Sequence, residues 1–438
     1  MSTGLTHDGL MGLLQRTFKQ LPDNRIGQNT TYAIADAAAA AFGVFFTQSP
    51  SFLSYQRDMQ RQKGHNNAQS LFGVEKIPSD NQIRNLLDPI SPQDLYPPFW
   101  EIYDQLNAQG TLNNQRGYAN NWLCAVDGIQ YFSSKAIHCE NCSETHKDDN
   151  VRYHHAAITP VLVAPNSSAV ISLEPEFITP QDGSEKQDCE QNAIKRWVER
   201  NADRFAPNTV TVLADDLHSH QPLCELLLSN HFNFILVCKP DSHKTLYEEI
   251  ELLDKIDAVS QVVVRRWNGR FYERWAYRYV NSAPLRGGEK ALQVNWCEIT
   301  ITHELEGTQL YHNSFVTNHL INDDTVKPIV ASGRSRWKTE NEGNNTLKNQ
   351  GYHLGHNFGH GKKHLSSVLV TLNLLAFLCH TVLDLTSFLY QRLRRELGTR
   401  QTFFGDIRTL TRYFYFSGWL ALLDFMAEGL EIGLSHRS

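Results

Sequence analysis

The spacing of apolar positions in the first quarter of the chain is typical of helices. The stretch 32–46, YAIADAAAAAFGVFF, is a strong helix former. A later helix is predicted to start at Ser79 or Asp80, either of which can cap it, and to end before Pro89. We therefore predict a separate helical domain over residues 1–115.

Short apolar runs replace this pattern after residue 115. Five of them have the composition of strands: 122–132, 153–163, 169–173, 209–214 and 232–239. Helices are predicted between the later runs, at 185–201 and 222–230. Three early strands followed by helices that alternate with buried strands indicate an α/β sheet covered by helices on both faces.

The pattern changes again between residues 258 and 330, where segments such as SQVVVRRW and QVNWCEITITHEL alternate polar with apolar positions. Alternation with many Val, Tyr, Trp and Thr residues predicts an antiparallel β insertion. After it, 335–348 is predicted to be helical. The predicted domains are 1–115, 116–257 for the first part of the α/β domain, 258–330 for the insertion, 331–390 for its second part and 391–438 for C-terminal helices.

Residues 365–389 form a long apolar stretch that could in principle cross a membrane. Asn373, His380 and Asp384 lie within it, and such side chains are costly at the centre of a bilayer. We therefore expect a buried core helix and no membrane association.

Charge and cysteine content narrow the class of protein. The 438 residues carry a formal net charge of -6, which argues against a protein that coats nucleic acid indiscriminately. Positive charge is nevertheless concentrated locally, at 334–363 and at 392–412. Eight scattered cysteines and an N-terminus without a signal-peptide pattern indicate a reduced, cytoplasmic protein. The pattern GxxxxGK[ST] is missing from the sequence, so a P-loop ATP motor is not expected.

Two aspartates stand where chemistry is expected in an α/β sheet. Asp215 directly follows the apolar run 209–214, at the carboxyl end of a strand, where functional residues gather. Taken alone, it could equally be a helix cap. Asp127 lies within the run 122–132, and a carboxylate inside a buried strand is costly unless it is paired or binds a metal.

A third carboxylate lies in the basic stretch 333–364. Arg336 and Glu340 are four residues apart and share a helix face, which by itself predicts no more than a surface ion pair. The surrounding basic residues, which include Lys348, allow a different interpretation. Glu340 could bind a metal while its neighbours hold phosphates.

These residues together resemble the signature of bacterial insertion-sequence transposases of the DDE type. In that family an arginine, a tryptophan, the catalytic glutamate and a later lysine lie on one helix, which Arg336, Trp337, Glu340 and Lys348 match. The segments around Asp127 and Asp215 resemble the strands that carry the two catalytic aspartates. The similarity covers roughly residues 120–385 and includes the β insertion.

The resemblance implies a ribonuclease-H-like mixed sheet and a transposase that cuts transposon ends and joins them to target DNA. Asp127, Asp215 and Glu340 would be both catalytic residues and ligands of two Mg²⁺ ions, for which Mn²⁺ could substitute. The implied partners are double-stranded DNA and a second protomer, as a homodimer on DNA, in the bacterial cytoplasm at the nucleoid. The residues implied to contact DNA are Arg336, Trp337, Lys338 and Lys348.

Two positions depart from the family pattern. Gly333 stands where a tyrosine is common, and Leu347 stands seven residues after Glu340, where the lysine usually lies. Two assignments also have neighbouring competitors, because Glu342 could replace Glu340 and Asp216 could replace Asp215. Asp188 and Glu190 are kept as residues that could lie near the site.

Other signals weigh less. The segment HCENCSETH contains His138, Cys139, Cys142 and His146, but a partner knuckle is missing, so a zinc site is not the favoured interpretation. The histidines at 353, 356, 360 and 364 are interleaved with glycines, which favours a polar loop near DNA over a metal cluster. Trp267, Trp275 and Trp296 of the insertion are expected in the core, although one could stack on a flipped base.

Three alternatives stay open. A ribonuclease-H-fold nuclease or resolvase would use the same carboxylates without strand transfer. An inactive DNA-binding protein derived from a transposase would retain the fold only. An integral membrane protein would be built on 365–389. The N-terminal helical domain is equally compatible with a scaffold or oligomerisation module and with one that binds DNA ends.

Overall fold

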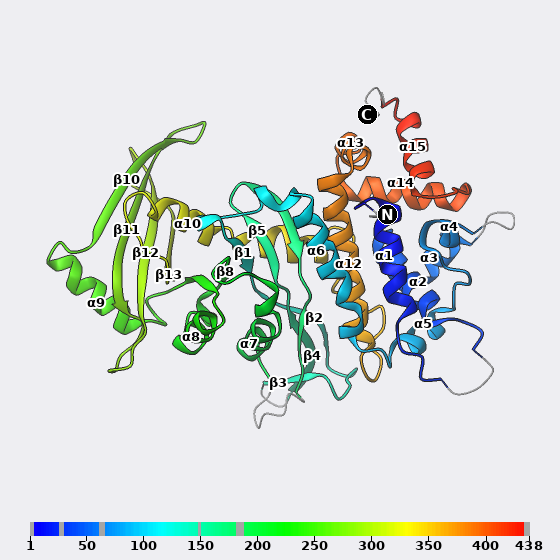
Figure 1. Ribbon diagram of the computed structural model, residues 1–438, viewed down its shortest axis with the longest axis horizontal. Helices are drawn as coiled ribbons and strands as arrows, with labels where there is room; N and C mark the ends of the chain where they lie inside the picture. Colours follow the sequence, from blue (N-terminus) through cyan, green and yellow to red (C-terminus); the bar gives the residue numbers. More distant parts are fainter. Residues whose placement is uncertain (1–3, 26–29, 61–65, 148–149, 181–187, 433–438) are drawn as a thin grey trace.

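The computed structural model describes residues 4–25, 30–60, 66–147, 150–180 and 188–432. It contains a large mixed sheet with helices packed on it and a helical body at one end (Figure 1). The predicted α/β class is therefore confirmed. The strands of the large sheet are β1 (Trp122–Ala125), β5 (Val161–Ala164), β6 (Ser167–Ser172), β8 (Val210–Ala214), β9 (Asn233–Val237), β10 (Ser260–Trp267), β11 (Tyr272–Pro284), β12 (Gln293–His303) and β13 (Gln309–Thr317).

The large sheet has nine strands in the order β10-β11-β12-β13-β9-β8-β1-β5-β6. Strand β1 pairs in parallel with β8, and β8 pairs in parallel with β9. On its other side β1 pairs antiparallel with β5, and β5 pairs antiparallel with β6. Strands β1, β8 and β9 are buried at every position, which explains their continuous apolar sequences.

The predicted β insertion is present and continues the central sheet. Strand β13 pairs antiparallel with β9, so β10 to β13 extend the sheet at one edge. Helix α9 (Lys244–Lys255) packs against β11, and the insertion lies far from the helical body (Figure 1). Strand β10 forms the outer edge of the sheet.

A second, smaller sheet leaves the first one at Asp127. It contains β2 (Gly128–Ser134), β3 (Ser143–Lys147), β4 (Asn150–Ile158) and β7 (Glu176–Ile178). The predicted single strand 122–132 is therefore two strands in two sheets. The Val126 amide still donates to Leu213 O of the large sheet (2.9 Å), whereas Asp127 O accepts from Thr159 N beside β4 (3.0 Å).

The N-terminal and C-terminal helices pack together into one helical body. Asn67 Nδ2 donates to the carbonyl oxygens of Thr411 and Phe414, both at 2.8 Å, and Trp419 Nε1 donates to Leu71 O (2.9 Å). The helices of this body are α1 (His7–Lys19), α2 (Ile34–Phe46), α3 (Phe52–Met59), α4 (Asn67–Phe72), α5 (Asp80–Leu87), α6 (Pro97–Ala108), α12 (Leu365–Thr386), α13 (Phe388–Glu396), α14 (Arg400–Tyr413) and α15 (Trp419–Gly429). The predicted start of α5 is also observed, with Ser79 as its N-cap.

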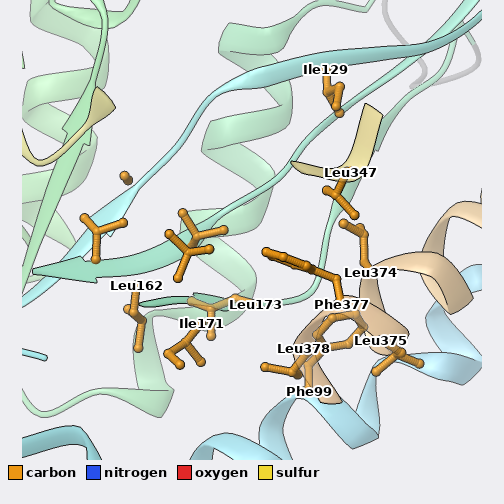
Figure 2. Packing of buried hydrophobic residues seen from close by; sticks show 14 of the residues in the cluster. Phe99, Ile129, Leu162, Ile171, Leu173, Leu347, Leu374, Leu375, Phe377 and Leu378 are labelled. Carbon is orange, nitrogen blue, oxygen red and sulfur yellow. The ribbon is translucent and has the colours of Figure 1, made fainter. Parts of the chain in front are cut away.

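Helix α12 joins the helical body to the sheet. It is long and apolar enough to cross a membrane, but 89% of its apolar window is buried inside the protein. Phe377 and Leu378 of this helix lie close to Ile171 of β6 and to Leu173, the residue that follows β6 (Figure 2). His380 of this helix hydrogen-bonds through Nδ1 to the hydroxyl group of Tyr352, which precedes the helix in the chain (2.6 Å). The expectation of a core helix is thus confirmed, since protein and not lipid covers its apolar surface.

Candidate functional site

Asp127 and Asp215 lie side by side at the carboxyl ends of two neighbouring parallel strands. Ala125 of β1 is in register with Leu213 of β8, so each aspartate follows its paired residue by two positions. Adjacent strands are about 4.8 Å apart, and the two carboxylates therefore leave the sheet at the same level. Asp215 Oδ1 also accepts a hydrogen bond from Leu217 N (3.1 Å), which fixes the turn after β8.

Glu340 acts electrostatically on Asp127 from a helical segment far along the chain. It lies in a π-helical turn (Thr339–Asn344) that follows helix α10 (Val326–Arg334). Burial is the main cause that raises the pKa of Asp127. The nearby carboxylates of Asp215 and Glu340 raise it further, and the Arg336 guanidinium opposes them. The three acidic residues of the resemblance thus act on one another electrostatically, with Arg336 among them.

Glu190 is a fourth acidic side chain at this place. It is the first residue of helix α7 (Glu190–Asn201), and the predicted start at 185 falls outside the described residues. A Cβ added to Gly128 would lie 2.1 Å from Glu190 Oε1, so only glycine after Asp127 lets this carboxylate approach. Burial raises the pKa of Glu190, and Asp127 and Asp215 add to the effect. We call Asp127, Asp215, Glu340 and Glu190 the carboxylate cluster.

Asp188, two residues before Glu190, belongs to a neighbouring network of ion pairs. The Arg196 guanidinium binds both of its carboxylate oxygens, at 3.0 and 2.7 Å, and also binds Glu176 Oε1 at 2.8 Å. This buried pairing fixes the start of α7, from which Glu190 projects. Asp188 is therefore already paired, whereas Glu190 faces Asp127.

His218 was not identified from the sequence. Its Nε2 lies 3.7 Å from Asp215 Oδ1 and 3.9 Å from Glu190 Oε2, and the side chain is buried. Burial is the main cause that lowers the pKa of His218, and Asp215 opposes it. The sequence signal was its position in DDLHSH, three residues after Asp215, which a short 3₁₀ turn brings back to the cluster.

The two competing carboxylates face elsewhere. Asp216 accepts hydrogen bonds from Lys239 N (2.7 Å) and from the Ser242 hydroxyl, which ties β8 to the loop after β9. Glu342 lies near Lys338, whose pKa it raises against the stronger effect of burial. Neither is among the groups that shift the pKa of Asp127.

The residues implied to contact DNA differ in exposure. Lys338 is buried, and its ammonium donates to the carbonyl oxygens of Ala164, Pro165 (3.0 Å) and Ser167 (2.5 Å) at the turn between β5 and β6. All three of its donors are used inside the protein, so we leave Lys338 out of the proposed DNA-binding set. Trp337 is 46% exposed. Lys348 is also exposed, on the short helix α11 (Asn345–Asn349).

Close packing accounts for the glycine that departs from the family pattern. A Cβ on Gly333 would lie 2.8 Å from side-chain atoms of both Ile235 on β9 and Phe315 on β13. A larger residue at this position would therefore require Ile235 and Phe315 to move out of their packing between helix α10 and the sheet.

Lys348 follows the π-helical turn Thr339–Asn344. Hydrogen bonds in such a turn span five residues instead of four, so each residue rotates less around the axis than in an α-helix. The eight residues from Glu340 to Lys348 therefore complete less rotation than eight α-helical residues would. Leu347, seven residues after Glu340, is buried, whereas Lys348 is exposed.

The structure also brings together four side chains that the sequence did not predict to form one site. Among the described residues, one set of three or more metal-ligating side chains has its ligand atoms all within 4.8 Å of one another: Cys139, Cys142, His155 and His360. The CxxC motif belongs to it, but His138 and His146 do not. Of the four loop histidines, His360 alone takes part, so the expectation of a merely polar loop is incomplete. We call this set the thiol–imidazole cluster.

The carboxylate cluster is more open than this set, because no three of its members have ligand oxygen atoms all within 4.8 Å of one another.

Neither protein-family models nor curated proteins give a match to this chain.

Proposed function

We propose that this protein is a DNA transposase of the DDE type. The observation that carries the proposal is that Asp127 and Asp215 end two adjacent parallel strands, and that Glu340 and Arg336 both act electrostatically on Asp127. The sheet supports it. Along β6-β5-β1-β8-β9, three antiparallel strands come first in the chain and two parallel strands follow, as expected of a ribonuclease-H-like sheet.

The donor set fits Mg²⁺. Carboxylate oxygens are the hard ligands that this ion prefers, and crowded acidic groups whose pKa burial has raised gain from a neutralising cation. Asp127, Asp215 and Glu340 are the residues that would hold two such ions. When bound, two such ions activate the attacking oxygen and stabilise the leaving oxygen of a phosphodiester. Mn²⁺ could substitute for either ion.

The chain's own groups would position DNA. Arg336 and Lys348 would contact phosphates and Trp337 would pack against a sugar or base, which orients the strand without reading its sequence. In the insertion, Trp296 is 1% exposed and packs in the core, whereas Trp267 is 57% exposed at the end of edge strand β10. Trp267 is thus the insertion tryptophan that could stack on a base. A homodimer holding two DNA ends, in a bacterial cytoplasm at the nucleoid, belongs to this proposal.

The test uses a plasmid that carries the DNA flanking this coding sequence on both sides. With purified protein and Mg²⁺ or Mn²⁺, we expect cuts at the element ends and products joined to a second plasmid. Cutting without joined products would favour a nuclease or resolvase. Specific binding of the ends without cutting, under both metals, would favour an inactive derivative.

A further inference from the structure

We propose that the thiol–imidazole cluster is a structural zinc site. Its ligands come from three segments: Cys139 and Cys142 from the turn after β2, His155 from β4, and, far along the chain, His360 from the loop between α11 and α12. Cys142, His155 and His360 are buried and Cys139 is partly buried. The inference does not depend on the proposed function.

The spacing of the ligand atoms matches a zinc tetrahedron. Zn–S bonds of about 2.3 Å and Zn–N bonds of about 2.05 Å put ligand atoms about 3.8 Å (S to S), about 3.6 Å (S to N) and about 3.3 Å (N to N) apart. The two Sγ atoms are 3.9 Å apart, and the two Nε2 atoms are 3.1 Å apart. His155 Nε2 lies 3.5 Å from Cys139 Sγ and 3.4 Å from Cys142 Sγ, and His360 Nε2 lies 3.4 Å from Cys142 Sγ.

The surroundings orient these ligands. His360 Nδ1 donates to Gly361 O (3.0 Å), which leaves Nε2 as the atom that faces the cluster. His155 also hydrogen-bonds the main chain of Asn141. Partners of this kind on the second ring nitrogen are typical of metal-bound histidines. Cys142 N donates to Cys139 O (3.2 Å), closing the turn that brings the two sulfur atoms together.

Four protein ligands leave no position for a substrate, which is typical of structural zinc. Two thiolates and two imidazoles also favour zinc over Mg²⁺, which prefers oxygen. The ion would fasten the loop after α11 to the small sheet. That sheet begins directly after Asp127, and the loop follows the helical segment that carries Glu340. The zinc would thus hold two parts of the carboxylate cluster in a fixed relation.

The first experiment measures the metal content of the full-length protein purified under reducing conditions, by plasma mass spectrometry. We expect one zinc per chain. Cobalt(II) added to the metal-free wild-type chain should produce the intense visible absorption of a tetrahedral site with thiolate ligands, a readout that needs no variant. Absence of zinc together with absence of the cobalt spectrum, or a Cys139–Cys142 disulfide in the freshly purified protein, would overturn the proposal.

Neighbouring histidines give matched controls. His155→Ala should lose most of the zinc, and His154→Ala, on the opposite face of β4, should keep it. His360→Ala and His356→Ala form a second pair in the loop. Equal zinc loss in both members of a pair would contradict the assigned ligands. Asp127→Asn should retain zinc, so a failure of the transposase proposal leaves this result unaffected.

Discussion

Strand β2 begins beside the carboxylate cluster and ends beside the thiol–imidazole cluster, and the two sets differ in almost every physical respect. The first has hard oxygen atoms in a partly exposed position, where burial and then repulsion between carboxylates raise the pKa of Asp127 and Glu190. The second has soft sulfur and nitrogen atoms, already spaced for an ion. An open set of ligands can admit a substrate, and its coordination can change during a reaction. A closed set has no position for a substrate and holds chain segments together.

The largest expected effect is on catalysis. Glu340→Gln should lower the rate of DNA cleavage by about 10²–10³-fold or more, because the proposed function makes Glu340 a ligand of the metal ions that stabilise the transition state. The measurement is single-turnover cleavage of labelled element ends with Mg²⁺. Glu342→Gln is the control on the same helical turn and should cleave normally. The reverse result would assign the third ligand to Glu342.

The next effect sharpens the contrast with the thiol–imidazole cluster. Removal of its zinc should lower the Tm by roughly 5 °C or more, because an ion bound only by the folded chain stabilises that state. Calorimetry with a zinc-selective chelator, followed by addition of zinc, measures the loss and its recovery. Mg²⁺ should not restore the Tm. Full recovery by Mg²⁺ would mean that the two clusters are not chemically distinct.

Two lysines of one helical segment provide a third test. Lys338→Met should lower the free energy of unfolding by about 2–3 kcal/mol, because three buried carbonyl groups lose a charged donor. Denaturant unfolding measures this. Lys348→Met should change stability by less than about 0.5 kcal/mol but lower the salt dependence of DNA binding by about one phosphate contact. Weaker DNA binding by a fully stable Lys338→Met chain would return Lys338 to the DNA-binding set.

The smallest effect concerns pH. A carboxyl group whose pKa is raised by folding favours the folded state when protonated, so stability falls as the pH rises from about 4 through the raised pKa of Asp127. The asparagine of the Asp127→Asn variant cannot ionise, so the variant does not lose folding stability in this way as the pH rises. Without Mg²⁺, its Tm at pH 7 should exceed that of the wild type by ~1–3 °C, and the difference should vanish below about pH 3.5. A lower Tm for the variant at pH 7 would show that the Asp127 carboxylate stabilises the fold.

Much of the fold could be predicted because its signals are local. Continuous apolar runs gave β8 and β9, alternation gave the insertion, and polar residues within 365–389 indicated a core helix. The break at Asp127 could not be predicted, because Val126 and Ile129 are equally apolar and only their partners place them in different sheets. Pro160, which lacks an amide donor, was the available sign that 153–163 also divides into two strands.

Asp215 could be selected from its place at a strand end and Asp127 as a carboxylate inside an apolar run, whereas Glu340 was selected through the resemblance to the DDE family. Glu190 could be named as a neighbour of the site, but its approach to Asp127 depends on Gly128, which has no side chain. His155 and His360 could not be paired from the sequence, because they are 205 residues apart in the chain. A zinc pattern is recognisable when its ligands come in two close pairs. Here only the CxxC pair is local, so the other half depends on tertiary structure.

The shared core of the first and last helices has a consequence for synthesis of the protein. A ribosome delivers α1 and α2 several hundred residues before α15, yet His7 and Phe46 complete their packing against Trp419. The N-terminal helices must therefore wait, with apolar surface exposed, until almost the whole chain has emerged. A chain that stops before α15 would lack the Trp419 ring, and this part of the core would stay open.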